Sequence, residues 1–404
     1  MALDASFDTS QHLLAPLPRP TTNGRNDGFS FWKLREDWRT CPELQSDQSE
    51  ESARHFLYEE YLTAEHRQPP HRMNAYYRVK DFIPPAMRHW LNSAAIQLRG
   101  TRSFPHWPVE SALIDYWRSW LRSSLDSQRV NDDWHIGFWP SGKKCGIVLT
   151  HDVESAGGMK RIERMADIEE KYGFRSSWNL PLQQYRVDWN LVDRLRARGF
   201  EFGAHGLSHD GRLFRSESDF SELTPIIERL AHQHQLRGFR SPSTLRRAEW
   251  IARMNFDYDC SFSDTDPYEP QPGGTCSLFP FFLGDLVELP YTLPQDHTLI
   301  NLVHRDPLAL WTTKAHWIES VGGMILTLTH PDYCGSGYYL SQYEALLKRL
   351  SGFDAWRALP SEAACWWRER DRMTLTTDTG APVIKGPGAE RAVARRLSTE
   401  PLAN

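Results

Sequence analysis

The stretch CGIVLTHDVE, residues 145–154, decides the fold, because an apolar strand ends there in two acids. Side chains alternate along a strand, so Asp152 and Glu154 are expected to point to the same face. An acid at such a position can also cap a following helix. Capping accounts for one acid but not for two acids that flank an apolar Val153, and a functional role for both is therefore predicted.

A second stretch, EFGAHGLSHDG at residues 201–211, places two histidines after another strand. His205 and His209 are four residues apart, a spacing that lets both imidazoles reach one ion from a single turn. The pair alone is a modest signal, since surface histidines are common. Together with Glu154 it gives three protein ligands and leaves a position for water, as in catalytic metal sites. We predict a site for a divalent metal.

Two further strand ends carry polar candidates. Arg240 in GFRSPST could lower the pKa of a neighbouring acid, and a surface arginine is the alternative. Pro242 and Ser243 shape the next turn, where a backbone N–H could stabilise an oxyanion. His330 ends the apolar strand MILTLTH and is a candidate general acid, with a core histidine as the alternative.

From residue 145 to about residue 350 the chain alternates apolar strands with amphipathic helices. This alternation predicts an α/β fold with a parallel sheet. The polar candidates follow several different strands, which favours a distorted or incomplete (β/α) barrel over an open doubly wound sheet. No GxGxxG follows the first strand, which argues against a dinucleotide-binding fold. The barrel is assigned to residues 140–371.

The flanking segments differ from the barrel in composition. Residues 1–28 and 372–404 are predicted to be tails, the first of them disordered. Residues 29–135 contain three stretches with helical spacing of apolar residues and are predicted to form a helical N-terminal region. Arg78 and Lys80 in this region could bind the phosphates of a sugar carried on a lipid or a nucleotide. The alternative is that the region is only a helical layer covering the barrel.

Composition narrows the class of protein. The chain has 404 residues and a net charge of −5, which gives no reason to expect a nucleic-acid partner. No apolar window is long enough for a transmembrane helix and the N-terminus lacks the pattern of a signal peptide, so a cytoplasmic protein is expected. The six cysteines lack CxxC spacing and are expected to be free thiols. The 16 tryptophans suit core packing first and stacking on sugar rings second.

In order, THDVE, HGLSH, RSPS and LTHP resemble the motifs of the polysaccharide deacetylase superfamily, the NodB-like carbohydrate esterase family four. The resemblance covers about residues 145–335. It implies a distorted (β/α) barrel in which a divalent metal, often zinc, serves to hydrolyse N-acetyl or related C–N bonds. It also implies the following roles: catalytic base for Asp152, metal binding for His205 and His209, tethering of the base for Arg240, and general acid for His330.

The chain departs from the family's pattern at two positions. Many members have two adjacent aspartates in the first motif, whereas Val153 follows the first acid here. Because alternation restores the direction of the side chain two residues on, Glu154 is inferred to replace the metal-binding aspartate. In the third motif Ser243 follows the proline, where the family usually has an aromatic residue, so one wall of a sugar groove is absent.

The expected function is a metal-dependent hydrolase that removes an acetyl group from an N-acetylated sugar or glycan precursor. The helical extension and the segment PQDHTL at 294–299 look like deacetylase-like proteins of bacterial surface-glycan assembly. In that segment Asp296 and His297 either line the site or only form a turn. A C–N hydrolase acting on a non-sugar amide or cyclic imide, and a metal-free binding protein or pseudoenzyme, remain as alternatives.

Overall fold

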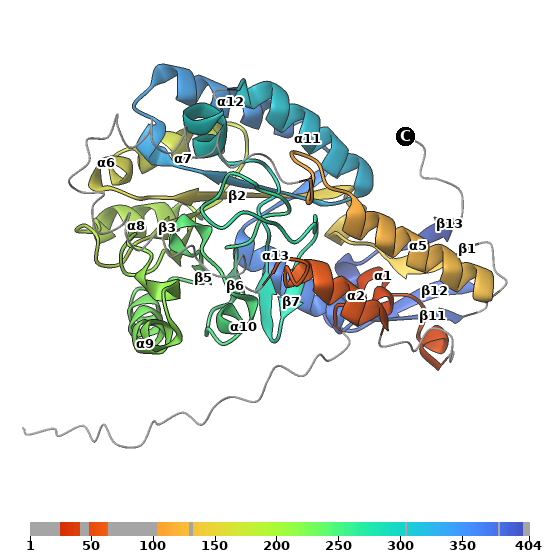
Figure 1. Ribbon diagram of the computed structural model, residues 1–404. Helices are drawn as coiled ribbons and strands as arrows, with labels where there is room; N and C mark the ends of the chain where they lie inside the picture. Colours follow the sequence, from red (N-terminus) through yellow and green to blue (C-terminus); the bar gives the residue numbers. More distant parts are fainter. Residues whose placement is uncertain are drawn as a thin grey trace, which may run out of the picture.

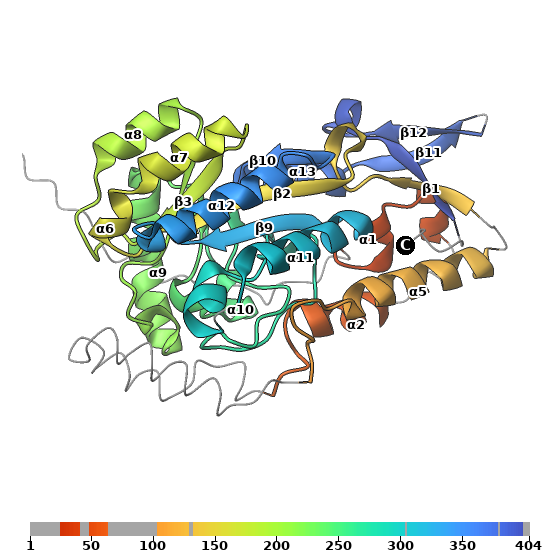
Figure 2. The ribbon, with the colours of Figure 1, turned by 90° about the horizontal axis from the view of Figure 1, so that it is seen from above.

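The computed structural model describes residues 25–40, 48–63, 103–128, 132–303, 305–378 and 380–398. Nine strands form one curled sheet, and helices lie along its outer face (Figures 1 and 2). All pairings in this sheet are parallel except one at its end. The predicted α/β class and incomplete (β/α) barrel are therefore confirmed.

The sheet consists of β2 (Cys145–Asp152), β3 (Ser176–Leu180), β4 (Glu201–Ala204), β5 (Gly238–Phe239), β6 (Tyr258–Asp259), β7 (Phe281–Leu283), β8 (Leu286–Glu288), β9 (Met324–Thr329) and β10 (Ala355–Ala358). The helices between and after these strands are α6 (Ala156–Met159), α7 (Ile162–Lys171), α8 (Trp189–Ala197), α9 (Glu217–Gln233), α10 (Ala248–Ile251), α11 (Pro307–Val321), α12 (Gly337–Leu350) and α13 (Pro360–Asp371). Five of them begin at a side chain that accepts a backbone N–H, namely Ser155, Asp188, Ser216, Asp306 and Ser336.

The centre of the sheet is β2, whose eight residues are all buried. One edge of β2 pairs with β9 over residues 146–151. The other edge is shared, because β10 pairs with residues 145–148 and β3 with residues 149–152. A strand buried on both faces needs a continuous apolar run, and CGIVL supplies it.

The barrel closes through a loop and not through a ladder of strand pairs. The path runs from β2 through β3, β4, β5 and β6 to the antiparallel pair β8–β7. After β8, the backbone N–H groups of Thr292 and Leu293 both donate to the carbonyl of Leu326 in β9, each at 3.1 Å. Because the paired strands are parallel, their carboxyl ends meet at one rim, where active sites of such barrels lie.

The described part of the N-terminal region is largely helical. It contains α1 (Gly28–Trp32), the short helix η1 (Glu36–Thr40), α2 (Gln48–Leu57) and α5 (Ala112–Ser127). The predicted helix at 84–100, and Arg78 and Lys80, lie outside the described residues. Residues 1–24 of the predicted tail do as well, but Asn26 exchanges two hydrogen bonds with the backbone of Phe282, so that segment is attached at residue 26.

The prediction of a C-terminal tail from residue 372 is wrong for the residues described there. β11 (Thr374–Asp378) and β12 (Ala381–Lys385) form an antiparallel hairpin. β13 (Ala394–Ser398) pairs with β1 (Asp132–Ile136), which lies far earlier in the chain. A strand whose partner is so distant has no local signal, which is why the polar composition of this segment was misleading.

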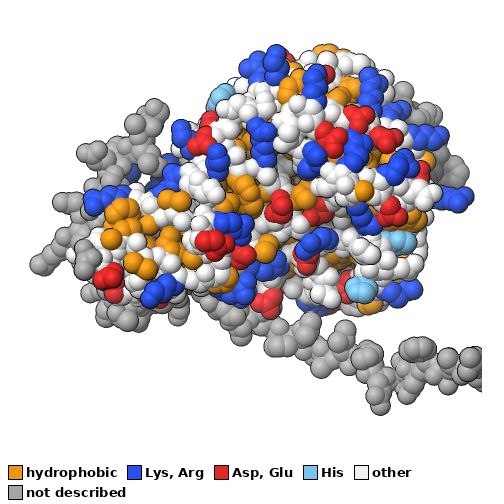
Figure 3. Space-filling view, turned by 180° about the vertical axis from the view of Figure 1, so that it is seen from behind, with side chains coloured by type: hydrophobic (Ala, Val, Ile, Leu, Met, Phe, Trp, Pro, Cys, Tyr) orange, Lys and Arg blue, Asp and Glu red, His pale blue; other side chains and the backbone are white. Residues whose placement is uncertain are grey.

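None of the described helices is long and apolar enough to cross a membrane. On the face opposite to that of Figure 1, basic and acidic side chains intermingle over much of the surface (Figure 3). Core packing accounts for many tryptophans, and four are fully buried: Trp139, Trp178, Trp311 and Trp366. The five cysteines of the described ranges are free thiols, as predicted.

Candidate active site

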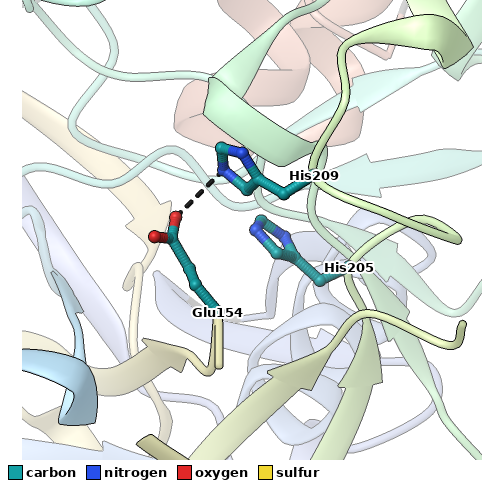
Figure 4. Close-up of side chains that lie close together, drawn as sticks. All are labelled: Glu154, His205 and His209. Atoms are coloured by element: carbon teal, nitrogen blue, oxygen red, sulfur yellow. Dashed lines mark ion pairs between the residues drawn. The ribbon is translucent and has the colours of Figure 1, made fainter. Parts of the chain in front are cut away.

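Three predicted metal ligands converge at the carboxyl end of the barrel. Glu154 follows β2, and His205 and His209 follow β4. Their side chains point toward one another (Figure 4), and their candidate ligand atoms all lie within 4.8 Å of one another. The Nε2 of His209 is 2.9 Å from the Oε1 of Glu154. Two imidazoles and a carboxylate form a donor set that suits zinc and related divalent ions.

The imidazole of His205 has a defined tautomer. Its ring is 1% exposed, and its Nδ1 lies 2.9 Å from the carbonyl oxygen of Arg240. A carbonyl only accepts, so Nδ1 carries the hydrogen and Nε2 keeps its lone pair. That Nε2 is buried and has no hydrogen-bond partner among the described residues. A buried acceptor without a partner is costly, and a bound cation would satisfy it, so the residues fit a metal.

Asp152, the last residue of β2, lies beside this group and is buried. Its Oδ1 accepts a hydrogen bond of 2.9 Å from the amide of Asn179, and its Oδ2 is 3.8 Å from the Nε2 of His205. Burial opposes ionisation of Asp152, but the electrostatic attraction of the neighbouring His205 and Arg240 outweighs it and the pKa is lowered. The carboxyl is therefore kept as a carboxylate, the form that a general base requires.

Arg240 is a fully buried residue and not the surface arginine that the sequence left open. Its Nε donates to the carbonyl of Cys260 at 2.8 Å, and its Nη2 donates to the hydroxyl of Thr150 at 2.9 Å. The remaining Nη1 lies 3.7 Å from the Oδ1 of Asp152. These contacts fix the guanidinium so that its charge faces the carboxylate.

His330 follows β9 and is a buried residue with a partner, Asp296. Asp296 accepts from the backbone N–H of His330 at 2.7 Å and lies 2.6 Å from its Nδ1. It also accepts from the hydroxyl of Tyr339. Burial disfavours the charged imidazolium, but Asp296 outweighs it and raises the pKa of His330 to about 10. The Nε2 of His330 lies 3.8 Å from the Oε1 of Glu154, so a protonated imidazole faces the site.

The turn after β5 carries Pro242 and Ser243 to the same site. The hydroxyl of Ser243 lies 3.5 Å from the Nε2 of His209. Ser243 and Thr244 have φ angles of 55° and 48°, a left-handed conformation that is strained for residues with a side chain. Pro242 packs against Gly206, where an added Cβ would lie 2.9 Å from the proline Cγ. The strain is concentrated beside the candidate metal ligands, as is common at functional sites.

Several residues that the sequence did not single out complete the site. Asn179 is the next-to-last residue of β3 and contacts Asp152, and its position near a strand end could have marked it. Gln184 donates to the carbonyl of Glu154 at 2.6 Å and accepts from the N–H of His209 at 2.5 Å. Asp332 accepts from the N–H of Glu154 at 3.0 Å. These loop contacts are non-local, so spacing along the chain does not reveal them.

The two alternatives predicted for Asp296 and His297, a turn or a place at the site, are not exclusive for Asp296. Asp296 accepts from the N–H of His297 at 2.7 Å, which starts the short helix η7 (His297–Leu302), and it also contacts His330. His297 lies one layer further out, where its Nδ1 is 2.9 Å from the hydroxyl of Tyr333. Asp296 is therefore a turn residue and a site residue together.

No family model matches this sequence, and no curated protein matches it. Among solved structures, a putative polysaccharide deacetylase from Mycobacterium smegmatis is 18% identical, with a TM-score of 0.45 over 59% of this chain and 96% of that one. Puue allantoinase is 13% identical, with a TM-score of 0.46 over 57% and 92% of the two chains. BA3943, a CE4 family pseudoenzyme from Bacillus anthracis, is 14% identical, with a TM-score of 0.37 over 55% and 66%. Similarities at this level do not establish an activity, so the function of this chain is inferred from the residues of its own site.

Proposed function

We propose that the protein is a metal-dependent hydrolase that removes an acetyl group from an N-acetylated sugar. One observation supports this above all. The group formed by Glu154, His205 and His209 lies between an ionised carboxylate, Asp152, which is next to His205, and a protonated imidazole, His330, which is next to Glu154. Amide hydrolysis needs an electrophilic centre, a base for water and an acid for the leaving nitrogen. All three requirements have candidates within one cluster of side chains.

In this proposal the metal is held by Glu154, His205 and His209. Once bound, a divalent ion would polarise the scissile carbonyl and make a water molecule more acidic. Asp152, fixed by Asn179 and Arg240, accepts the proton of the attacking water.

Other groups of the site act in the second half of the reaction. The turn at Pro242 and Ser243 offers the backbone N–H of Ser243 to the developing oxyanion. His330, oriented by Asp296, donates the proton from its Nε2 to the departing nitrogen, because the Nδ1 proton is directed to the carboxylate. The products are acetate and a free amine.

The substrate is proposed to be a small N-acetylated sugar or a glycan precursor. Ser243 is small and polar, so the turn lacks the flat aromatic wall on which a polymer chain could stack. A C–N hydrolase acting on a non-sugar amide or cyclic imide would use the same side chains and is the second candidate. The third candidate is a barrel that binds a ligand without a metal. It is considered because Val153 stands where many members of the resembling family have a second aspartate.

Acetate release separates these candidates. The purified protein, supplied with zinc, should release acetate from one or more members of a panel of N-acetyl hexosamines. Ring opening of simple imides without acetate release would favour the second candidate. Neither activity, together with no bound metal, would contradict the proposal and leave the binding barrel.

A further inference from the structure

A cleft of about 610 Å³ opens at the end of the barrel opposite to the candidate active site. Its lining includes Lys143 and Lys144, which precede β2, and Gly322, which precedes β9. The candidate active site, in contrast, follows the last residues of these strands. A strand of eight residues spans about 25 Å, so the cleft and the candidate active site are separate places.

Apolar side chains from distant parts of the chain form the floor of the cleft. They come from α1, α5, the loop before β2, the loop before β7, and β13, and include Trp32, Leu121, Trp139, Phe279 and Leu397. Flat aromatic rings next to aliphatic groups make a surface that favours an apolar body over water. The volume lies in the range of clefts that bind small molecules.

The rim of the cleft is strongly basic. Among the residues that the structure describes, six cationic side chains line it and one acid does, Glu319; the cations are Arg118, Arg122, Lys143, Lys144, Arg395 and Arg396. The whole chain carries a net charge of −5, so this excess of positive charge is local. A concave surface lined by one sign of charge concentrates ligands of the opposite sign.

Two of these cations are available to a ligand. Arg118 and Arg122 lie one turn apart on α5, and the described part of the chain offers neither of them an ion pair or hydrogen bond. Lys143, by comparison, pairs with Asp354 at 2.8 Å. Guanidinium groups bind phosphate through paired N–H donors, so two neighbouring ones form a suitable anchor for it.

The buried His135 also lines the cleft, and its pKa reflects the positive charges around it. Burial is the main reason that its pKa is lowered to about 3, and the charges of Arg370 and Arg395 lower it further. A neutral imidazole adds a polar but uncharged group to the floor. The floor is thus free of charge while the rim is cationic.

We propose that this cleft binds an amphiphilic anion, namely an alkyl chain that ends in a phosphate. The chain would lie on the aromatic floor, and the phosphate would pair with Arg118 and Arg122 at the rim. A nucleic acid would require a basic stripe along the surface, whereas these cations surround a cavity of small-molecule size. The inference does not depend on the proposed hydrolase function, since no residue is shared between the two places.

Isothermal titration calorimetry with decyl phosphate, below its micelle concentration, tests the proposal. We expect one molecule to bind per chain. Inorganic phosphate tests charge without a chain, and decyl maltoside tests a chain without charge; each should bind at least tenfold more weakly. Equal binding of inorganic phosphate would mean a site for free anions, and equal binding of decyl maltoside would mean a detergent-like surface, and either result overturns the proposal.

Charge reversal locates the site. Arg118→Glu with Arg122→Glu should weaken decyl phosphate binding at least tenfold. The matched control, Arg229→Glu with Lys348→Glu, changes two exposed cations on α9 and α12 and should leave binding unchanged. Circular dichroism confirms that both variants are folded. If the two double variants behave alike, the cleft is not the binding site and the proposal fails.

Discussion

Glu59, which follows α2, forms a buried ion pair with Arg246, which follows β5. The two side chains are 3% and 1% exposed, and the guanidinium Nε donates to Glu59 Oε2 at 2.8 Å. Arg246 also donates to the carbonyl of Thr244 at 3.1 Å, one residue after Ser243. The N-terminal region is thereby joined to the strained turn of the candidate active site.

Loss of Glu59 should destabilise the protein more than loss of its neighbour Glu60. Glu59→Ala leaves a buried arginine without a counter-charge, which typically costs about 3–5 kcal/mol. Glu60 pairs with Arg54 where both side chains are partly exposed, and Glu60→Ala should cost about 1 kcal/mol. Urea unfolding of both variants measures the two free energies. Equal losses would show that the buried pair has no special role in joining the region to the barrel.

The two acids of the first stretch should respond differently to substitution. Asp152→Asn should retain metal and reduce turnover by about 10²-fold or more, since it removes the general base. Glu154→Gln should reduce metal content, since it removes a ligand. Metal analysis and acetate release on the same preparations distinguish the roles. An active Asp152→Asn variant together with full metal in Glu154→Gln would show that the roles are reversed.

Asp296 should act as a positioning residue for His330. Asp296→Asn removes the charge that favours the imidazolium, so turnover should fall about tenfold or more, part of the 10²–10⁴-fold that a general acid supplies. Tyr339→Phe removes only one hydrogen bond to Asp296 and should have a smaller effect. Asp306→Asn, at the start of α11, is the control and should leave turnover unchanged. If metal content falls with turnover in Asp296→Asn, the residue acts on the metal group and not on the acid.

His135 should make the protein less stable in acid. Its pKa is about 3 in the folded protein and about 6.5 when unfolded, so below pH 6.5 the unfolded chain binds the proton more tightly. The stability contributed by the neutral ring is present above pH 6.5 and is lost as the pH falls from 6.5 towards 3. The loss from this group is at most about 1.4 kcal/mol per pH unit. Unfolding of the wild type and His135→Gln at several pH values measures it, and parallel curves would contradict this origin.

The barrel and the candidate residues at the ends of its strands could be predicted from sequence, because both leave local signals. Buried strands such as β2 read as apolar runs, and Asp152, His205 and His330 stand at their ends. The contacts of Asn179 with Asp152 and of Asp296 with His330 could not be predicted, since they join residues 27 and 34 positions apart across the rim.

The ends of the chain were harder to predict for the same reason. β13 gains its backbone partners from β1, so its hydrogen bonds leave no trace in the neighbouring sequence. The strands β5 and β6 contain only two residues each, too few to show the alternation by which a strand is read from sequence. Pairing at a distance, and not composition, decides the structure at both places.

Metal content measured by elemental analysis tests the central claim most directly. The wild type, after exposure to zinc and gel filtration, should retain about one ion per chain, as a site with three protein ligands predicts. His205→Ala should lose the ion and the acetate-releasing activity together, whereas His316→Ala, an exposed histidine on α11, should retain both. Full occupancy in His205→Ala, or a wild type that binds no ion, would contradict the assignment of Glu154, His205 and His209 as a metal centre.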